Sequence, residues 1–228
     1  MVLSKFFGNH RRREQDRHTQ TVMAGIFRAA VGDLGSPESM PLALYCVSVI
    51  AGHAVQQGAL AERIAQGLAH QAPDVVPVTS SAGRTYVFGN SVAAALLRKG
   101  DKPGFIDWMA VHGKLVADDR RLSTWFGKSA ATVGGEDYGR PSPPLDRFGW
   151  PAIDDVMANA DAVVAYLRSG GLVPGQFGDI LTNAARVALL RAADHRELGS
   201  LADFAVLAIE AAIAGSHMVP VRGAVSAT

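Results

Sequence analysis

The chain has 228 residues, of which 48% are hydrophobic and 19% charged, and its formal net charge at pH 7 is +1. This composition excludes disorder over most of the length, and the balanced charge excludes a dedicated binder of nucleic acid or another polyanion. Aromatic residues make up only 7% and alanine is abundant, which favours helices. We therefore expect an all-α fold in the form of an irregular multi-helix bundle.

Residues 1–20 form a basic tail, with five Lys or Arg side chains against two acidic ones and a net charge of +3. Its charges follow a short apolar stretch, which is the opposite of the order in a secretory signal. Arginines contact phosphate groups, and exposed aromatic rings insert into a partner protein or an anionic surface. The candidate partner-binding residues of the tail are therefore Phe6, Phe7, Arg11, Arg12 and Arg13.

Residues 21–128 are predicted to form a helical subdomain. An apolar stripe over residues 22–30 indicates one helix, and a longer helix is expected to begin near Pro41 and to continue to Leu68. The apolar run from Leu42 to Val55 is too short to span a membrane. It is therefore predicted to be a buried helix, and no transmembrane segment is expected.

Residues 75–88 predict one short β-hairpin, because two β-rich pieces flank a Ser-Ser-Ala-Gly turn. Pro77 restricts the first strand to a sheet edge, since proline has no N–H to donate to a neighbouring strand. Two further helices are expected after the hairpin, over residues 92–99 and from Pro103 to Val116.

Residues 129–149 are rich in Gly and Pro and have no periodicity, so they are predicted to be a linker or loop between two helical subdomains. Aromatic residues flank this segment on both sides. Packing of the two halves against each other would explain them, and a ligand or partner site at the junction is the alternative. The candidate partner-binding residues here are Trp125, Phe126 and Trp150.

Residues 150–217 predict a second helical subdomain, with helices over 151–169, 177–194 and 201–214. Ser200 and Asp203 have the spacing of a capping box before the last helix. This last helix is apolar nearly all round and must be covered on most sides. Residues 218–228 remain as a C-terminal tail.

The motifs for metal and nucleotide binding are missing from the sequence. The seven histidines show no metal-ligand spacing, and no phosphate-binding glycine motif follows a predicted strand. The single cysteine, Cys46, excludes an internal disulfide and is predicted to be a buried, inert thiol, which fits a cytoplasmic protein. We expect no metal and no other cofactor.

No motif in the chain specifies a chemistry. The function is therefore predicted from the apolar helix faces, which are more extensive than the chain alone can bury. We expect a non-enzymatic helical protein-binding subunit, adaptor or assembly factor that acts in the cytoplasm, with a protein partner or by self-association. One alternative is an enzyme of unfamiliar family with a cleft near residues 129–149. A second alternative is weak binding of nucleic acid or an anionic surface through the basic tail. The enzyme alternative would use residues from His112, Asp118, Asp119, Arg120 and Arg121.

Overall fold

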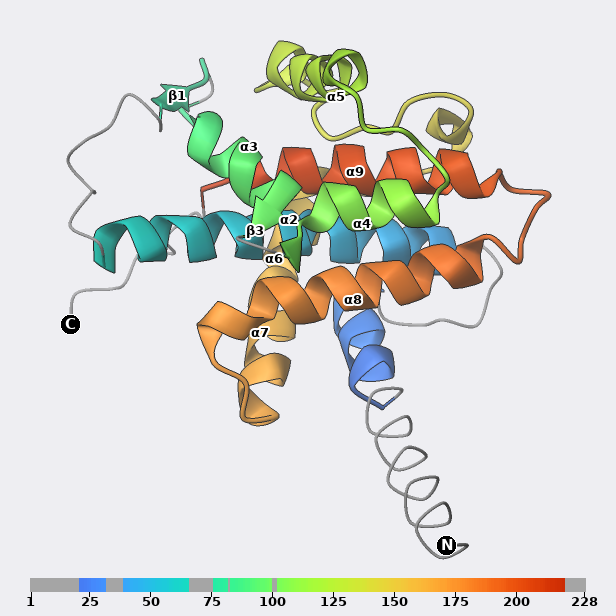
Figure 1. The fold of residues 1–228 in the computed structure, drawn as a ribbon, viewed down its shortest axis with the longest axis horizontal. Helices are drawn as coiled ribbons and strands as arrows, with labels where there is room; N and C mark the ends of the chain where they lie inside the picture. The colour runs from blue at the N-terminus through green and yellow to red at the C-terminus, as the bar shows by residue number, and fades with distance from the viewer. Residues whose placement is uncertain (1–20, 32–38, 66–75, 82, 100–101, 220–228) are drawn as a thin grey trace, which may run out of the picture.

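A computed structural model describes residues 21–31, 39–65, 76–81, 83–99 and 102–219. Two apolar helices lie side by side at its centre, α2 (Ser39–Ala65) and α9 (Leu201–His217) (Figure 1). Two further helices pack against this pair, α4 (Phe105–His112) and α8 (Pro174–Ala192). Over the described residues the fold is mostly helical with a short hairpin, which confirms the predicted fold class.

The remaining elements surround these four helices. An apolar helix, Thr21–Val31, packs into the core through Ile26 and Phe27. The others are β1 (Val76–Thr79), β2 (Thr85–Phe88), α3 (Asn90–Leu97), β3 (Arg98–Lys99), β4 (Lys102–Pro103), α5 (Asp119–Thr132), a short 3-10 helix (Leu145–Arg147), α6 (Ile153–Ala158) and α7 (Ala160–Ser169).

The contact between α2 and α9 leaves no space for a side chain where the two helices cross. A Cβ atom on Gly52 would overlap the carbonyl of Ala212, and one on Gly215 would overlap the carbonyl of Val49. Because glycine lacks a Cβ, the two backbones come into direct contact at this point. The central pair therefore depends on two small residues as well as on apolar ones.

Helix α9 begins and is buried as the sequence predicts. The Ser200 hydroxyl accepts a hydrogen bond from the Asp203 N–H, and the Asp203 carboxylate accepts one from the Ser200 N–H at 2.9 Å. This confirms the capping box. From Phe204 to His217 only Val206 is more than slightly exposed, because other elements cover the helix on nearly all sides.

The predicted hairpin is present, with β1 and β2 antiparallel and Val76 opposite Phe88. The Ser80 N–H donates to the Arg84 carbonyl at 2.8 Å, and hydrogen-bonded pairs alternate along an antiparallel ladder. Pro77 therefore falls in a non-bonded pair, with its ring nitrogen towards the open edge of β1. This confirms the edge position predicted from the proline.

Several elements differ from the sequence prediction. The helix expected over residues 92–99 ends at Leu97, where β3 begins, and the helix expected from Pro103 to Val116 covers only Phe105–His112. The helix expected over residues 151–169 is divided into α6 and α7 at Asn159, whose N–H donates to the Val156 carbonyl three residues back in a tighter turn. The loop expected from residue 129 starts later, because α5 continues to Thr132. The Asp118 carboxylate begins α5 by accepting the Arg121 N–H at 2.9 Å.

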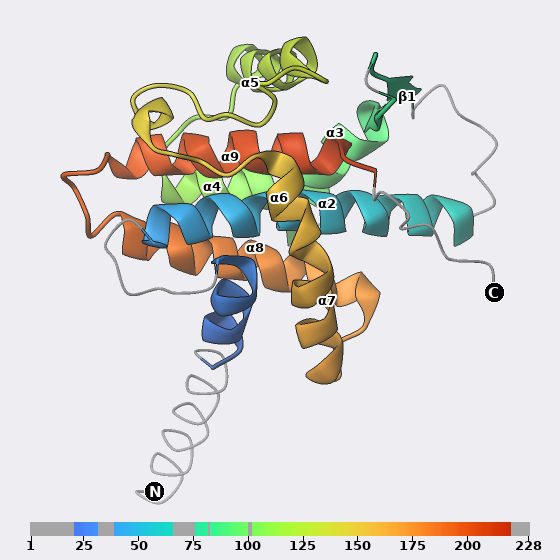
Figure 2. The ribbon, with the colours of Figure 1, turned by 180° about the vertical axis from the view of Figure 1, so that it is seen from behind.

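The segments on either side of residues 129–149 share one hydrophobic core, since α2 packs along both α8 and α9. Residues 133–152, called the strap below, leave α5 and cross α9 before reaching α6 (Figure 2). Among the described residues one helical stretch, Ser39–Ala61, has the length and hydropathy to cross a membrane, and most of it is buried inside the molecule.

Replacing Gly52 by Ala is expected to destabilise the protein, because the new methyl group would overlap the backbone of α9 and force the helices apart. Overpacking of this kind costs about 1–3 kcal/mol. Gly58→Ala is the matched control, since this glycine lies in the same helix with open space at its Cβ position. Urea denaturation should show a lower free energy of unfolding for Gly52→Ala only, and equal stability of both variants would contradict the contact described.

Candidate functional site

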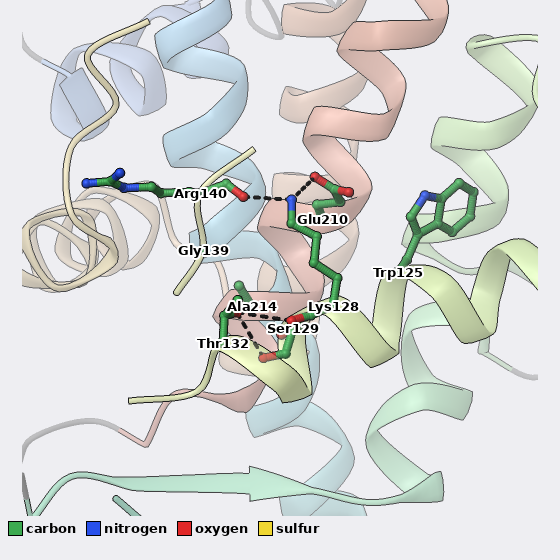
Figure 3. A pocket seen from close by; sticks show the side chains of 8 residues that line it. All are labelled: Trp125, Lys128, Ser129, Thr132, Gly139, Arg140, Glu210 and Ala214. Atoms are coloured by element: carbon green, nitrogen blue, oxygen red, sulfur yellow. Dashed lines mark hydrogen bonds and ion pairs between the residues drawn. The ribbon is translucent and has the colours of Figure 1, made fainter. Parts of the chain in front are cut away.

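A buried carboxylate, Glu210, lies in the middle of apolar α9 and is 8% exposed. The ammonium of Lys128, from α5, lies 2.8 Å from one of its oxygens (Figure 3). Ser142, from the strap, donates to both oxygens, through its N–H at 2.9 Å and its hydroxyl at 2.7 Å. The carboxylate thus joins α5 and the strap to α9.

The Lys128 ammonium has one acceptor for each of its three protons. Besides Glu210 it donates to the Arg140 carbonyl and to the Ser142 hydroxyl, both at 2.8 Å. A fully satisfied polar network of this kind holds its elements in one arrangement. The space beside it has a volume of about 10 Å³, which is room for about one water molecule. The cluster therefore fixes the strap and offers no room for a substrate.

A second polar contact, between Ser129 and His217, lies near this network. Their Oγ and Nδ1 atoms are 3.2 Å apart, and the side chains are 7% and 3% exposed. The imidazole lies 4.2 Å from the ring of Phe88 and 6.5 Å from that of Phe126, measured between centroids. Burial lowers the pKa of His217 to about 4, so the ring is neutral at pH 7 and links α5, α9 and β2.

A serine beside a neutral imidazole is part of the arrangement that activates a nucleophile. Here both side chains are buried, so the serine hydroxyl is not presented to a substrate at the surface of the folded chain. The pair therefore has a structural role in the folded chain.

Two tyrosine hydroxyls, one in the strap and one in α2, attach the strap to the central helices by hydrogen bonds to backbone carbonyls. The Tyr138 hydroxyl, in the strap, donates to the Ala214 carbonyl at 2.7 Å, and the Tyr45 hydroxyl of α2 donates to the Gly139 carbonyl at 3.1 Å. Burial raises the pKa of both phenols, so both remain hydrogen-bond donors at neutral pH. The strap is thus anchored to both central helices.

The structure places the three predicted aromatic residues in internal contacts. Trp125 is 6% exposed in the core, so its ring is not available to a partner while the chain is folded. Phe126 is half-buried beside His217. The indole of Trp150 donates to the Leu145 carbonyl at 2.6 Å and lies 5.1 Å from the ring of Tyr45. Phe6, Phe7, Arg11, Arg12 and Arg13 lie outside the described residues.

The residues of the enzyme alternative make separate local contacts. Asp118 caps α5, and Arg121 donates to the Val116 carbonyl at 3.2 Å. Asp119 and Arg120 are exposed in the first turn of α5. His112, at the end of α4, stacks on the ring of Trp108.

Cys46 is buried in α2, and burial raises its pKa to about 12, so the thiol stays protonated as predicted. Among the residues that the structure describes, no three His, Cys, Asp or Glu side chains come together as metal ligands.

An exposed apolar surface lies on α4 and α8; Trp108 was one of the aromatic residues considered from the sequence, whereas Val111 and Leu190 were not predicted to be part of a site. Trp108 and Val111 on α4 are 38% and 69% exposed, and Leu190 on α8 is 44% exposed. The signal was available, because Trp108, Val111 and His112 have the i, i+3, i+4 spacing of one helix face. We define the α4–α8 surface as Trp108, Val111, His112, Arg186 and Leu190.

No protein-family model, curated protein or solved structure matches this chain. Two regions of the described molecule bear on its function, the internal polar network at the strap and the exposed α4–α8 surface.

Lys128→Met is expected to lower the free energy of unfolding by about 1–3 kcal/mol, because it leaves the buried Glu210 carboxylate without its cation. The double variant with Glu210→Met should be less destabilised than the sum of the two single variants, since it leaves no buried charge behind. Arg140→Met is the control: it removes an exposed ion pair with Asp137 and should change stability by less than about 0.5 kcal/mol. Strictly additive effects in denaturant unfolding would contradict the network.

The stability of the chain is expected to fall as the pH is lowered from about 6.5 towards 4, partly through His217. In the unfolded chain this imidazole has its ordinary pKa of 6.5 and takes up a proton that the folded chain, with a pKa of about 4, does not bind. The contribution approaches about 1.4 kcal/mol per pH unit. Burial also lowers the pKa of His53, so the measurement is the difference between the wild type and His217→Asn. An identical pH dependence of unfolding in both would contradict this assignment.

Proposed function

We propose that the chain is a non-enzymatic helical subunit that binds another protein, as an adaptor or assembly factor. The observation that supports this is the exposure of the α4–α8 surface. Trp108 and Val111 lie one turn apart on α4, so their exposed apolar areas adjoin and are not scattered. Adjoining apolar side chains at the surface of a folded protein mark interaction sites.

The composition of the α4–α8 surface is that of an interface centre. Tryptophan and arginine are the residue types that contribute most to binding when a partner excludes water from them. Trp108 lies against His112, with ring centroids 5.4 Å apart and an angle of 9° between the rings. The Arg186 guanidinium donates to the Asn183 side chain at 3.1 and 2.8 Å. Both groups are thus held in place before any partner binds, which lowers the entropy cost of binding.

The polar groups of the chain favour binding over catalysis. Ser142 and Lys128 are used in fixing the strap, and the residues of the enzyme alternative make local contacts. The proposed location is the cytoplasm, which the buried, protonated Cys46 thiol suits.

In a lysate of the cells that make it, the full chain is expected to migrate as a particle larger than its own 24.0 kDa, because a partner covers the exposed apolar side chains. Size-exclusion chromatography with immunodetection measures this. The purified chain at the same concentration is the control, and its mass from light scattering separates self-association from a complex with another protein. A chain that elutes at 24.0 kDa in the lysate would count against the proposal.

A further inference from the structure

The α4–α8 surface is built from two helices that pack against each other (Figure 1). Arg186 lies close enough to His112 for its charge to act on the imidazole. Leu190 follows Arg186 by four residues and so lies on the same face of α8, one turn further on. The surface thus spans two helices in contact, and the link between its two parts is the pair His112 and Arg186.

This surface carries a cation that lacks an acidic partner. Among the described residues, Arg186 bonds only to the neutral amide oxygen of Asn183, and no carboxylate forms an ion pair with it. The Nε2 atom of His112 is shielded from solvent and also has no hydrogen-bond partner in the described part of the chain. The exposed apolar side chains therefore lie beside a guanidinium that a carboxylate would complement.

The charge of the surface argues against two occupants from the chain itself. Residues 1–20 carry a net charge of +3, so they would bring further cations to Arg186. A second copy bound face to face would place a second Arg186 in the same interface, so that like charges would face each other across the two-fold axis. A partner with acidic side chains fits both the apolar and the charged part.

The two neighbouring helices of the surface favour a helical segment of the partner over an extended one. Two neighbouring helices accept a third one through side chains spaced i, i+3, i+4 and i+7. Helix α4 has eight residues and is about 12 Å long, which matches two to three turns of a bound helix. An extended segment would instead need an open sheet edge, and at β1 this edge carries Pro77.

We propose that the α4–α8 surface binds an amphipathic helix of a partner protein, with an apolar stripe on Trp108, Val111 and Leu190 and an acidic side chain beside Arg186. This inference rests on the proposed function and specifies the kind of partner and the surface that it contacts.

The probe is a pair of fluorescently labelled helical peptides that share a leucine stripe and differ only in having Glu or Lys beside it. Measured by anisotropy against the full chain, the Glu peptide is expected to bind at least about tenfold more tightly than the Lys peptide. Arg186→Gln should abolish this preference, and Arg186→Lys should retain it. Trp108→Ala should weaken binding of the Glu peptide at least about tenfold.

Val173→Ser is the matched control, because Val173 is also exposed, at 57%, but lies at the other end of α8; it should leave the affinity unchanged. Equal binding of the two peptides, or a preference that survives Arg186→Gln, would overturn the proposal. Tighter peptide binding after deletion of residues 1–20 would identify the tail as the occupant. A concentration-dependent dimer that Trp108→Ala dissociates would identify a second copy, and either result would overturn the proposal as well.

The test of this surface can fail independently of the test of the proposed function. If the large particle in the lysate persists in Trp108→Ala, the chain binds a protein through another surface and only this inference fails. If the chain is a monomer in the lysate, the proposed function fails whatever the peptides do.

Discussion

The close contact between α2 and α9 is the constraint on which the rest of the structure depends. Gly52 and Gly215 allow the two backbones to touch, so a helix that is apolar on nearly every side can lie directly against another one. Such a helix must then be covered on its remaining sides. α4 and α8 cover part of the central pair, while α3, β2, α5, α6 and the strap cover other parts of α9. The outer elements are thus arranged around this one contact.

α5 and the strap are attached to α9 by contacts of a different kind from those between the central helices. The central helices pack through apolar side chains, whereas α5 and the strap combine buried rings, such as Trp125, with polar contacts of Lys128, Glu210, Ser142 and two tyrosine hydroxyls. Hydrogen bonds and ion pairs specify one geometry more strictly than apolar contacts do. A buried charge in an apolar helix is costly when unpaired, so Glu210 favours the one position of the strap in which Lys128 and Ser142 reach it.

Much of the fold could be predicted from the sequence, because its signals are local. The hairpin around Pro77, the capping box at Ser200 and the apolar periodicity of the later helices are visible within a few residues. The strap network was not predictable in this way, since Lys128 and Glu210 are 82 positions apart. Helix α5 was missed because it is mostly polar and buries only Trp125 and Ser129. Of the candidate aromatic residues, Trp125 has its role inside the chain, and the exposed ring is that of Trp108.

The order of the central helices along the chain has a consequence for synthesis on the ribosome. α2 is translated before α3 to α8, and α9 is translated after every other element described here. At the usual rate of about 5–20 residues per second, the stretch from the end of α2 to the end of α9 takes about 8–30 seconds to translate, and the apolar face of α2 waits that long for its partner helix. Nascent chains in that state expose surface that chaperones recognise. Contacts between distant segments also slow folding, so the native core forms late, once the C-terminal helix has left the exit tunnel.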